Sequence, residues 1–187
     1  MISPTAFAGK TYRGPVELLD IYKTTVELAG LPPPQPGVEG DSLVPTFSAP
    51  EVPIKDFAIS QTTRCHVSSQ GISGNRYIDP ATAQKYFSAC VRTPRADFGF
   101  MGYSLRTASW RYTGWFKWLN ITAATKGPGP DLASGPVGEE LYDHRNDTSH
   151  YNVDDYEYVN LAAHPDHTTI RDGLLAQLTK EVASWQK

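Results

Sequence analysis

The stretch that decides the fold reads Phe98-Gly99-Phe100-Met101-Gly102-Tyr103-Ser104-Leu105-Arg106-Thr107, then, after two residues, Trp110-Arg111-Tyr112-Thr113-Gly114-Trp115-Phe116-Lys117-Trp118. Both runs alternate along the chain, so that successive side chains fall on opposite faces of a strand. A short turn over residues 107–109 separates them. Two alternating runs joined by a short turn are typical of a β-hairpin. We therefore predict an antiparallel hairpin over residues 98–118.

Further elements surround this hairpin. Residues 56–61 read as a strand, with apolar side chains at Phe57 and Ile59. Residues 140–143 read as a third short strand, and a helix is expected from about Asp166 to Trp185. Its apolar side chains share one face, namely Ile170, Leu174, Leu175, Leu178, Val182 and Trp185. Antiparallel strands followed by a covering helix predict a small α+β layer.

The N-terminal part predicts a separate piece of structure. An amphipathic helix is expected over about residues 15–30, with Pro15 in its first turn and Gly30 just past its end. A Pro-rich connector follows, and we place the main boundary near residue 50, between regions 1–50 and 51–187. Residues 62–97 show no sustained period and are interpreted as a long loop with one short helix over 80–89.

Composition excludes some classes of function. The net charge of -3 gives no basic surface for nucleic acid or an anionic membrane. No apolar run approaches the roughly 20 residues needed to span a bilayer. The first ten residues lack the charged start and apolar core of a signal peptide, so none is expected in this chain. We therefore expect neither a nucleic-acid nor a membrane partner.

Two features bear weakly on the compartment. Cys65 and Cys90 either form one disulfide, worth on the order of 3 kcal/mol in the chain-entropy model, or remain two unpaired thiols. Asn120 and Asn146 each begin a tripeptide that matches the N-glycosylation acceptor pattern. Such tripeptides also arise by chance, so the sequence alone leaves the route of the protein open.

Three blocks in order resemble the C-terminal part of the sulfatase family, in its iduronate-2-sulfatase-like form. The first runs from Val16 through Pro32 to Gly40-Asp41-Ser42-Leu43. The second is Met101-Gly102-Tyr103-Ser104-Leu105-Arg106-Thr107 with Tyr112-Thr113-Gly114-Trp115. The third is Glu139-Glu140-Leu141-Tyr142-Asp143-His144 with Asn160-Leu161-Ala162. The insertion around Cys65 to Cys90 and the longer segment 151–156 depart from the family pattern.

The resemblance implies a fold and a function. The chain would comprise the end of an alkaline-phosphatase-like α/β domain and a small C-terminal subdomain with an antiparallel sheet and a covering helix. The parent would hydrolyse a sulfate ester on a sugar, with calcium, a formylglycine and a lysosomal or secreted location. Neither Cys65 nor Cys90 begins the Cys-x-Pro/Ala-x-Arg motif, so catalytic and metal residues are expected in a missing N-terminal domain.

Because catalytic and metal residues are expected outside this chain, we expect its functional residues to be substrate contacts. Gln61, Arg64 and Arg106 are candidates, because arginine forks pair with oxyanions such as those of a sulfated uronate. His144 with His150, and His164 with His167, lack the helical spacing of a metal pair, so we interpret them as structural. The Trp and Tyr cluster of the hairpin is interpreted as core, with a sugar-stacking surface as the alternative.

Two hypotheses follow. In the first, the chain is the C-terminal portion of a sulfatase, inactive alone, and its first helix leaves an apolar face uncovered. In the second, it is a free-standing module, derived from that subdomain, that binds carbohydrate or protein without catalysis.

Overall fold

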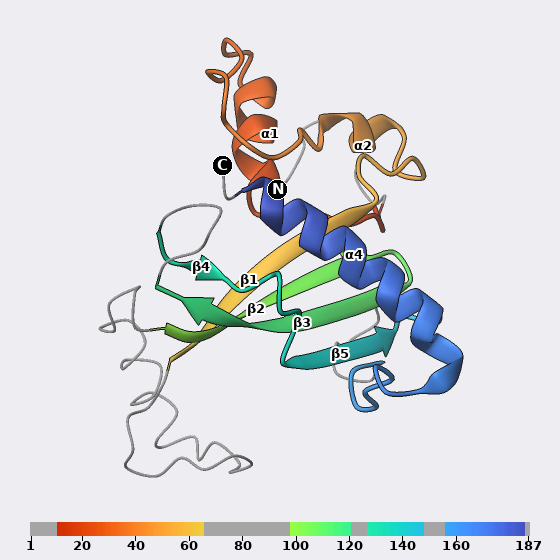
Figure 1. The fold of residues 1–187 in the computed structure, drawn as a ribbon. Helices are drawn as coiled ribbons and strands as arrows, with labels where there is room; N and C mark the ends of the chain where they lie inside the picture. Colours follow the sequence, from red (N-terminus) through yellow and green to blue (C-terminus); the bar gives the residue numbers. More distant parts are fainter. Residues whose placement is uncertain (1–10, 66–97, 121–126, 148–155, 186–187) are drawn as a thin grey trace, which may run out of the picture. The chain divides into compact units, whose positions relative to one another are not determined.

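The predicted hairpin is confirmed and lies at the centre of a sheet. In the computed structural model, which describes residues 11–65, 98–120, 127–147 and 156–185, β2 (Phe98–Thr107) and β3 (Trp110–Leu119) are joined by two residues (Figure 1). The order among the described strands is β1 (Phe57–Cys65), β2, β3 and β4 (Gly129–Pro130), and β5 (Gly138–Asp143) also pairs with β3. The antiparallel β4 pairs Trp118 with Pro130.

The helices include one that the sequence did not predict. Among the described residues they are α1 (Asp20–Leu28), α2 (Val44–Ser48) and α4 (Thr168–Ser184), and a 3-10 turn, η3 (Pro165–His167), leads into α4. The chain forms two compact units. Unit 1 comprises residues 1–60, 105–111 and 142–159, and unit 2 comprises residues 61–104, 112–141 and 160–187. The predicted boundary near residue 50 stays a prediction.

Unit 2 has its core between the sheet and α4, as the α+β prediction required. The helix crosses one face of β2 and β3 (Figure 1), and Leu174, Leu178 and Val182 of the predicted apolar face are buried. Tyr103 packs edge-on against Phe116 and also contacts the ring of Trp185, at centroid distances of 6.1 and 6.2 Å. The hairpin's alternation therefore places one set of its aromatic side chains, including Tyr103 and Phe116, under the helix.

The end of unit 2 is tied to β5 by one side chain. The Asn160 amide accepts from the backbone N–H of Leu141 (3.0 Å) and of Ala162 (2.9 Å), and it donates to the Glu139 carbonyl (2.9 Å). The Leu161 N–H donates to the Leu141 carbonyl over 2.8 Å. Asn160 thus satisfies backbone groups at the edge of β5 as a further strand would.

Unit 1 is organised around a buried carboxylate. Asp20 is fully buried and accepts hydrogen bonds from the Lys55 ammonium (2.6 Å) and from the backbone N–H groups of Glu17 (2.7 Å) and Asp41 (2.8 Å). Burial alone would raise the pKa of Asp20, but these hydrogen bonds outweigh it and hold that pKa below its ordinary value. Glu17 also pairs with Lys55 and accepts from the N–H of Ile59 at the start of β1.

The first helix begins later than predicted. The expected start at Pro15 is wrong, because α1 begins at Asp20, after a turn in which the Asp20 N–H donates to the Glu17 carbonyl. The Asp20 side chain is drawn inward to Lys55 instead of continuing a helix from Pro15. The predicted end is confirmed, since Gly30 has a φ of 63° and the Leu31 N–H donates to the Val26 carbonyl, as in a Schellman motif.

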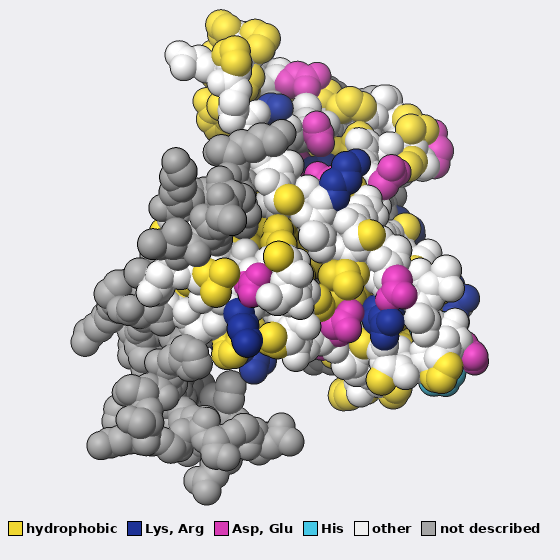
Figure 2. All heavy atoms as spheres, in the orientation of Figure 1, with side chains coloured by type: hydrophobic (Ala, Val, Ile, Leu, Met, Phe, Trp, Pro, Cys, Tyr) yellow, Lys and Arg dark blue, Asp and Glu magenta, His cyan; other side chains and the backbone are white. Residues whose placement is uncertain are grey.

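The orientation of α1 inverts the usual pattern of a surface helix. Its buried residues are Asp20 and Thr24, and the Thr24 hydroxyl accepts from the Leu43 N–H. The apolar side chains point outward, with Leu18 85% and Tyr22 56% exposed. Figure 2 shows hydrophobic side chains at the surface around α1. Further exposed members of this apolar face, defined as the α1 patch, are Val16, Leu19, Ile21, Leu28 and Leu31.

Truncating the helix side of the unit 2 core is expected to destabilise the protein. Leu178 is fully buried, so Leu178→Ala should lower the free energy of unfolding by about 2–5 kcal/mol. Urea unfolding followed by circular dichroism measures the change. Leu175→Ala, at a half-buried position one turn away, is the matched control and should cost less. Equal costs at the two positions would contradict the described core.

Removing the buried charge of Asp20 is expected to change how stability depends on pH. The folded pKa of Asp20 is lowered, so its contribution is complete above the unfolded pKa of about 4 and is lost as pH falls through the folded value. Asp20→Asn should therefore cost roughly 3 kcal/mol at pH 7 and progressively less toward pH 2.5. Asp41→Asn, at an exposed carboxylate 3.5 Å from Lys55, serves as the control. A cost that is independent of pH would refute the assignment.

Candidate functional site

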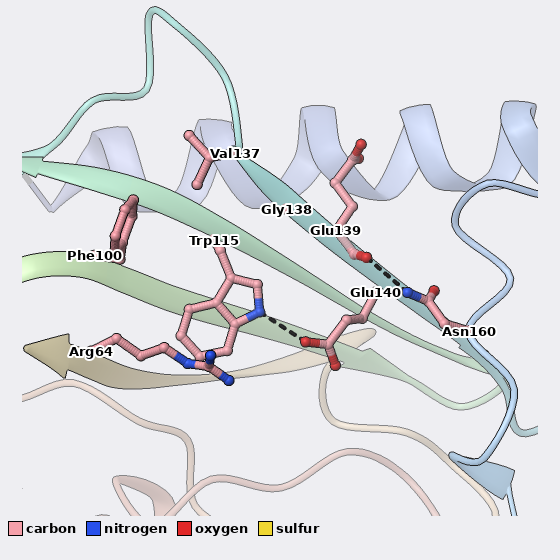
Figure 3. A pocket seen from close by; sticks show the side chains of 8 residues that line it. All are labelled: Arg64, Phe100, Trp115, Val137, Gly138, Glu139, Glu140 and Asn160. Atoms are coloured by element: carbon pink, nitrogen blue, oxygen red, sulfur yellow. Dashed lines mark hydrogen bonds between the residues drawn. The ribbon is translucent and has the colours of Figure 1, made fainter. Parts of the chain in front are cut away.

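A hollow in unit 2 is a candidate site among the described residues. It has a volume of about 420 Å³, is open to solvent, and lies over the sheet (Figure 3). We call it the Trp115 hollow. Its lining residues are Arg64, Phe100, Trp115, Val137, Gly138, Glu139, Glu140 and Asn160. They come from β1, β2, β3 and β5, from Val137 just before β5, and from Asn160 in the segment that precedes η3, so the site depends on the sheet's pairing.

Trp115 is held in place by contacts on two sides. A Cβ at Gly102 would lie 2.7 Å from the indole, so the ring rests directly on the backbone of β2. The indole N–H donates to the Glu140 carboxylate over 2.8 Å (Figure 3). The neighbouring Ser104 and Thr113 hydroxyls are bonded across the strands at 2.9 Å, which fits the same pairing of residues. The indole is therefore fixed by the geometry of the hairpin.

Arg64 lies over the indole. Its guanidinium carbon is 4.3 Å from the centroid of a Trp115 ring, a favourable cation–π distance. Among the described residues, no carboxylate forms an ion pair with Arg64, which is exposed. The indole therefore carries a cation that forms no ion pair with a carboxylate of the described chain, although Glu140 bonds to the same indole.

The two glutamates of β5 have different surroundings. Glu139 accepts from the Tyr112 hydroxyl (2.8 Å) and lies 3.9 Å from Arg171 of α4. Burial and this bond raise the pKa of Tyr112 far above its ordinary value, so the phenol stays neutral and donates to Glu139. Glu140 instead reaches the indole of Trp115 on the hollow side (Figure 3). Adjacent residues of β5 thus serve opposite faces of the sheet.

The structure brings one of the three predicted substrate residues to the hollow. Arg64 lines it, whereas Gln61 lies exposed on β1 and is not among the lining residues. Arg106 belongs to unit 1, where it lies 3.6 Å from Asp147. Burial and the nearby Arg111 lower the pKa of Arg106. The sequence missed Trp115 and Glu140 as site residues. The sequence did contain a signal for Trp115. With a loop of two residues, 108 and 109, the hairpin pairs Gly102 with Trp115, and a glycine opposite a tryptophan leaves room for the indole to lie on the backbone.

His144 is part of the same ionic network in unit 1. Its side chain is 2% exposed, and its ring nitrogens lie 3.0 Å from Asp147 and 3.2 Å from Glu157. Glu157 also pairs with Arg111. The buried imidazole thus joins two carboxylates that each contact an arginine, which agrees with the structural interpretation of this histidine.

Several predictions cannot be compared with this structure. Cys90 lies outside the described residues, as do His150, Thr122, Thr148 and the short helix expected over 80–89. The disulfide and the glycosylation of Asn120 and Asn146 therefore stay predictions. In the described ranges, no group of three or more His, Cys, Asp or Glu side chains is arranged to hold a metal ion. No described helix has the length and apolar character to cross a membrane.

Comparisons with known proteins give likeness in structure only. No family model matches the chain, and no curated protein matches it. A putative sulfatase from Bacteroides thetaiotaomicron aligns over 88% of this chain with 20% identity and a TM-score of 0.49. The phosphonate monoester hydrolase of Agrobacterium radiobacter aligns over 90% with 18% identity and a TM-score of 0.47. The chain spans about a quarter of the length of each, 24% and 25%.

Filling the space under the indole is expected to displace Trp115. Gly102→Ala places a Cβ 2.7 Å from the ring, whereas Gly138→Ala places one at 3.8 Å, an ordinary contact. The indole N–H resonance of Trp115, identified by its absence in Trp115→Phe, should move in Gly102→Ala and in Glu140→Gln. It should stay in place in Gly138→Ala. Equal shifts in both alanine variants would contradict the described stacking.

Proposed function

We propose that this chain is the C-terminal part of a sulfuric ester hydrolase of the sulfatase family, similar to the iduronate-2-sulfatase group. The parent protein would hydrolyse a sulfate ester on a sugar, and its formylglycine and calcium would lie outside this chain. The chain itself would supply scaffold and one wall of the substrate pocket, without catalysis of its own.

The α1 patch is the observation that carries the proposal of a preceding domain, and the assignment to the sulfatase family rests on the sequence resemblance. Asp20 and Thr24 face inward while Leu18, Tyr22 and Leu31 face solvent, with 60% of Leu31 exposed. An apolar stripe on a helix is stabilising only when another element covers it. A preceding domain of the parent protein, docked on α1, would bury this stripe and explain why the polar side of the helix is the buried one.

The architecture of unit 2 also supports the proposal. The resemblance implies an antiparallel sheet with a covering C-terminal helix, and unit 2 has this arrangement of β2, β3 and α4. The hairpin, the β5 strand and the Asn160-Leu161-Ala162 segment carry two of the three sequence blocks of the resemblance. They meet through Asn160 and Leu141, so the blocks form one structural unit.

The proposed substrate role rests on arginine. We propose Arg64 as the main contact for an anionic group, a role that its position in the lining of the hollow supports, with Gln61 and Arg106 as further proposed contacts. The aromatic alternative is less well supported. Trp110, Tyr112 and Trp118 are buried, and Trp115 lies between Gly102 and Arg64, so these rings offer little surface for a sugar.

The reading frame upstream of Met1 and an activity assay test the proposal together. We expect a Cys-x-Pro/Ala-x-Arg motif within a few hundred codons upstream. The chain alone should release no sulfate from 4-nitrocatechol sulfate, and the longer product should release it. An upstream sequence without the motif, or sulfate release by the chain alone, would overturn the proposal.

Dye binding tests the α1 patch directly. The chain should bind a hydrophobic fluorescent dye, and Leu18→Gln with Tyr22→Gln should reduce the signal at least twofold. Tyr158→Gln with Val159→Gln is the matched control in unit 1, because these side chains are also exposed (77% and 67%) but do not belong to the α1 patch. A monomeric chain that unfolds cooperatively and binds no dye would instead favour the free-standing binding module.

A further inference from the structure

Two arginine–tryptophan stacks occur among the described residues, and they differ in one respect. In unit 1, Arg145 lies over Trp110 at 5.0 Å. Its Nε and Nη2 donate to the two oxygens of Asp143, over 3.0 and 2.6 Å. In unit 2, Arg64 lies over Trp115 at 4.3 Å, with no described carboxylate paired to it. In the first stack the arginine is already paired with a carboxylate, that of Asp143. In the second, Arg64 is stacked on the indole but forms no ion pair with a described carboxylate.

The bond between Arg145 and Asp143 shows what the free edge of a stacked guanidinium can hold. A cation–π contact uses the planar face of the group, so the N–H donors at its edge stay available. Two parallel N–H···O bonds from that edge match a carboxylate, sulfate or phosphate group. Arg64 presents the same donors at the Trp115 hollow, where Phe100 and Val137 also line the wall.

The stack of Arg64 on Trp115 is preorganised in the absence of a ligand. Trp115 is fixed by Gly102 beneath it and by Glu140 at its N–H, so the indole limits where the guanidinium lies. Holding a long arginine side chain in one place lowers the entropy that a ligand must remove on binding. The glutamate that holds the indole is itself negative and repels an anion, so the Arg64 end of the hollow is the side on which an oxyanion binds.

We propose that the Trp115 hollow binds a small oxyanion through Arg64, with Gly102, Trp115 and Glu140 as positioning residues. The ligand is a carboxylate, sulfate or phosphate group, free or carried on a larger molecule. The inference deepens the proposed function and rests on it for the choice of sulfate as first probe. It does not require the catalytic residues of a parent enzyme.

Titration of the full chain with sodium sulfate tests the proposal. The Trp115 indole N–H and the Arg64 Nε–H are followed by NMR at constant ionic strength, with sodium chloride as the balancing salt. Parallel titrations with phosphate and acetate distinguish the three oxyanions. We expect saturable shifts that Arg64→Gln abolishes, and an apparent Kd at least fivefold weaker in Gly102→Ala and in Trp115→Leu, where the Arg64 Nε–H is the reporter.

Two variants control for charge and for the glycine substitution itself. Arg145→Gln removes the stacked arginine that Asp143 already occupies, so oxyanion binding at Trp115 should be unchanged. Gly173→Ala should leave binding unchanged too, because no atom lies within 4 Å of its added Cβ and Gly173 does not line the hollow. Circular dichroism checks that each variant is folded. The pair Gly102→Ala and Trp115→Leu keeps the positioning claim testable if one of them fails to fold.

The outcomes separate this inference from the proposed function. Shifts that do not saturate, or that persist in Arg64→Gln, mean screening by salt and overturn the inference. Unweakened binding in both positioning variants overturns the role of the stack. Neither result bears on whether an upstream Cys-x-Pro/Ala-x-Arg motif exists, and the absence of that motif would leave a measured oxyanion Kd standing.

Discussion

The cross-strand pairing of the β2–β3 hairpin is the constraint on which the rest of unit 2 depends. Thr107 closes the hairpin by accepting from the N–H groups of Ser109 and Trp110, and two residues make the loop. This short connection fixes which side chains share a face. Tyr103 and Phe116 then meet under α4, while Gly102 and Trp115 meet on the opposite side. A slip of one residue would exchange the core and the hollow.

Unit 1 depends on charge where unit 2 depends on apolar packing. Lys55 gathers Glu17, Asp20 and Asp41, so α1 is anchored by its polar residues. A buried ion pair stabilises only when its hydrogen bonds are satisfied, and Asp20 accepts three. The cost of this arrangement is the α1 patch left at the surface. A helix with its apolar side outward is stabilised when a further domain covers that side. The patch therefore carries the proposal of a missing domain.

Much of the fold could be predicted from local patterns. The hairpin, β5 and the apolar face of α4 follow from periodicity, which reports contacts between neighbours in sequence. The start of α1 could not be predicted in this way, because Lys55, 35 residues away, decides where Asp20 points. The site was predicted only at Arg64. Glu140 was missed because its bond to Trp115 spans 25 residues, and Arg106 lies in a different unit from Arg64 because Asp147 and Glu157 surround it there.

The contact between Gly102 and Trp115 has a consequence for how the sequence can change. The two positions share one volume, so a side chain added at Gly102 requires a smaller one at Trp115, and an indole at Trp115 requires that Gly102 stay bare. Related sequences should therefore vary at these two positions together, as a large–small pair, although 12 residues separate them between the described strands. An arginine at position 64 should also occur mainly in the related sequences that have tryptophan at position 115, because without the indole Arg64 loses its stacking partner.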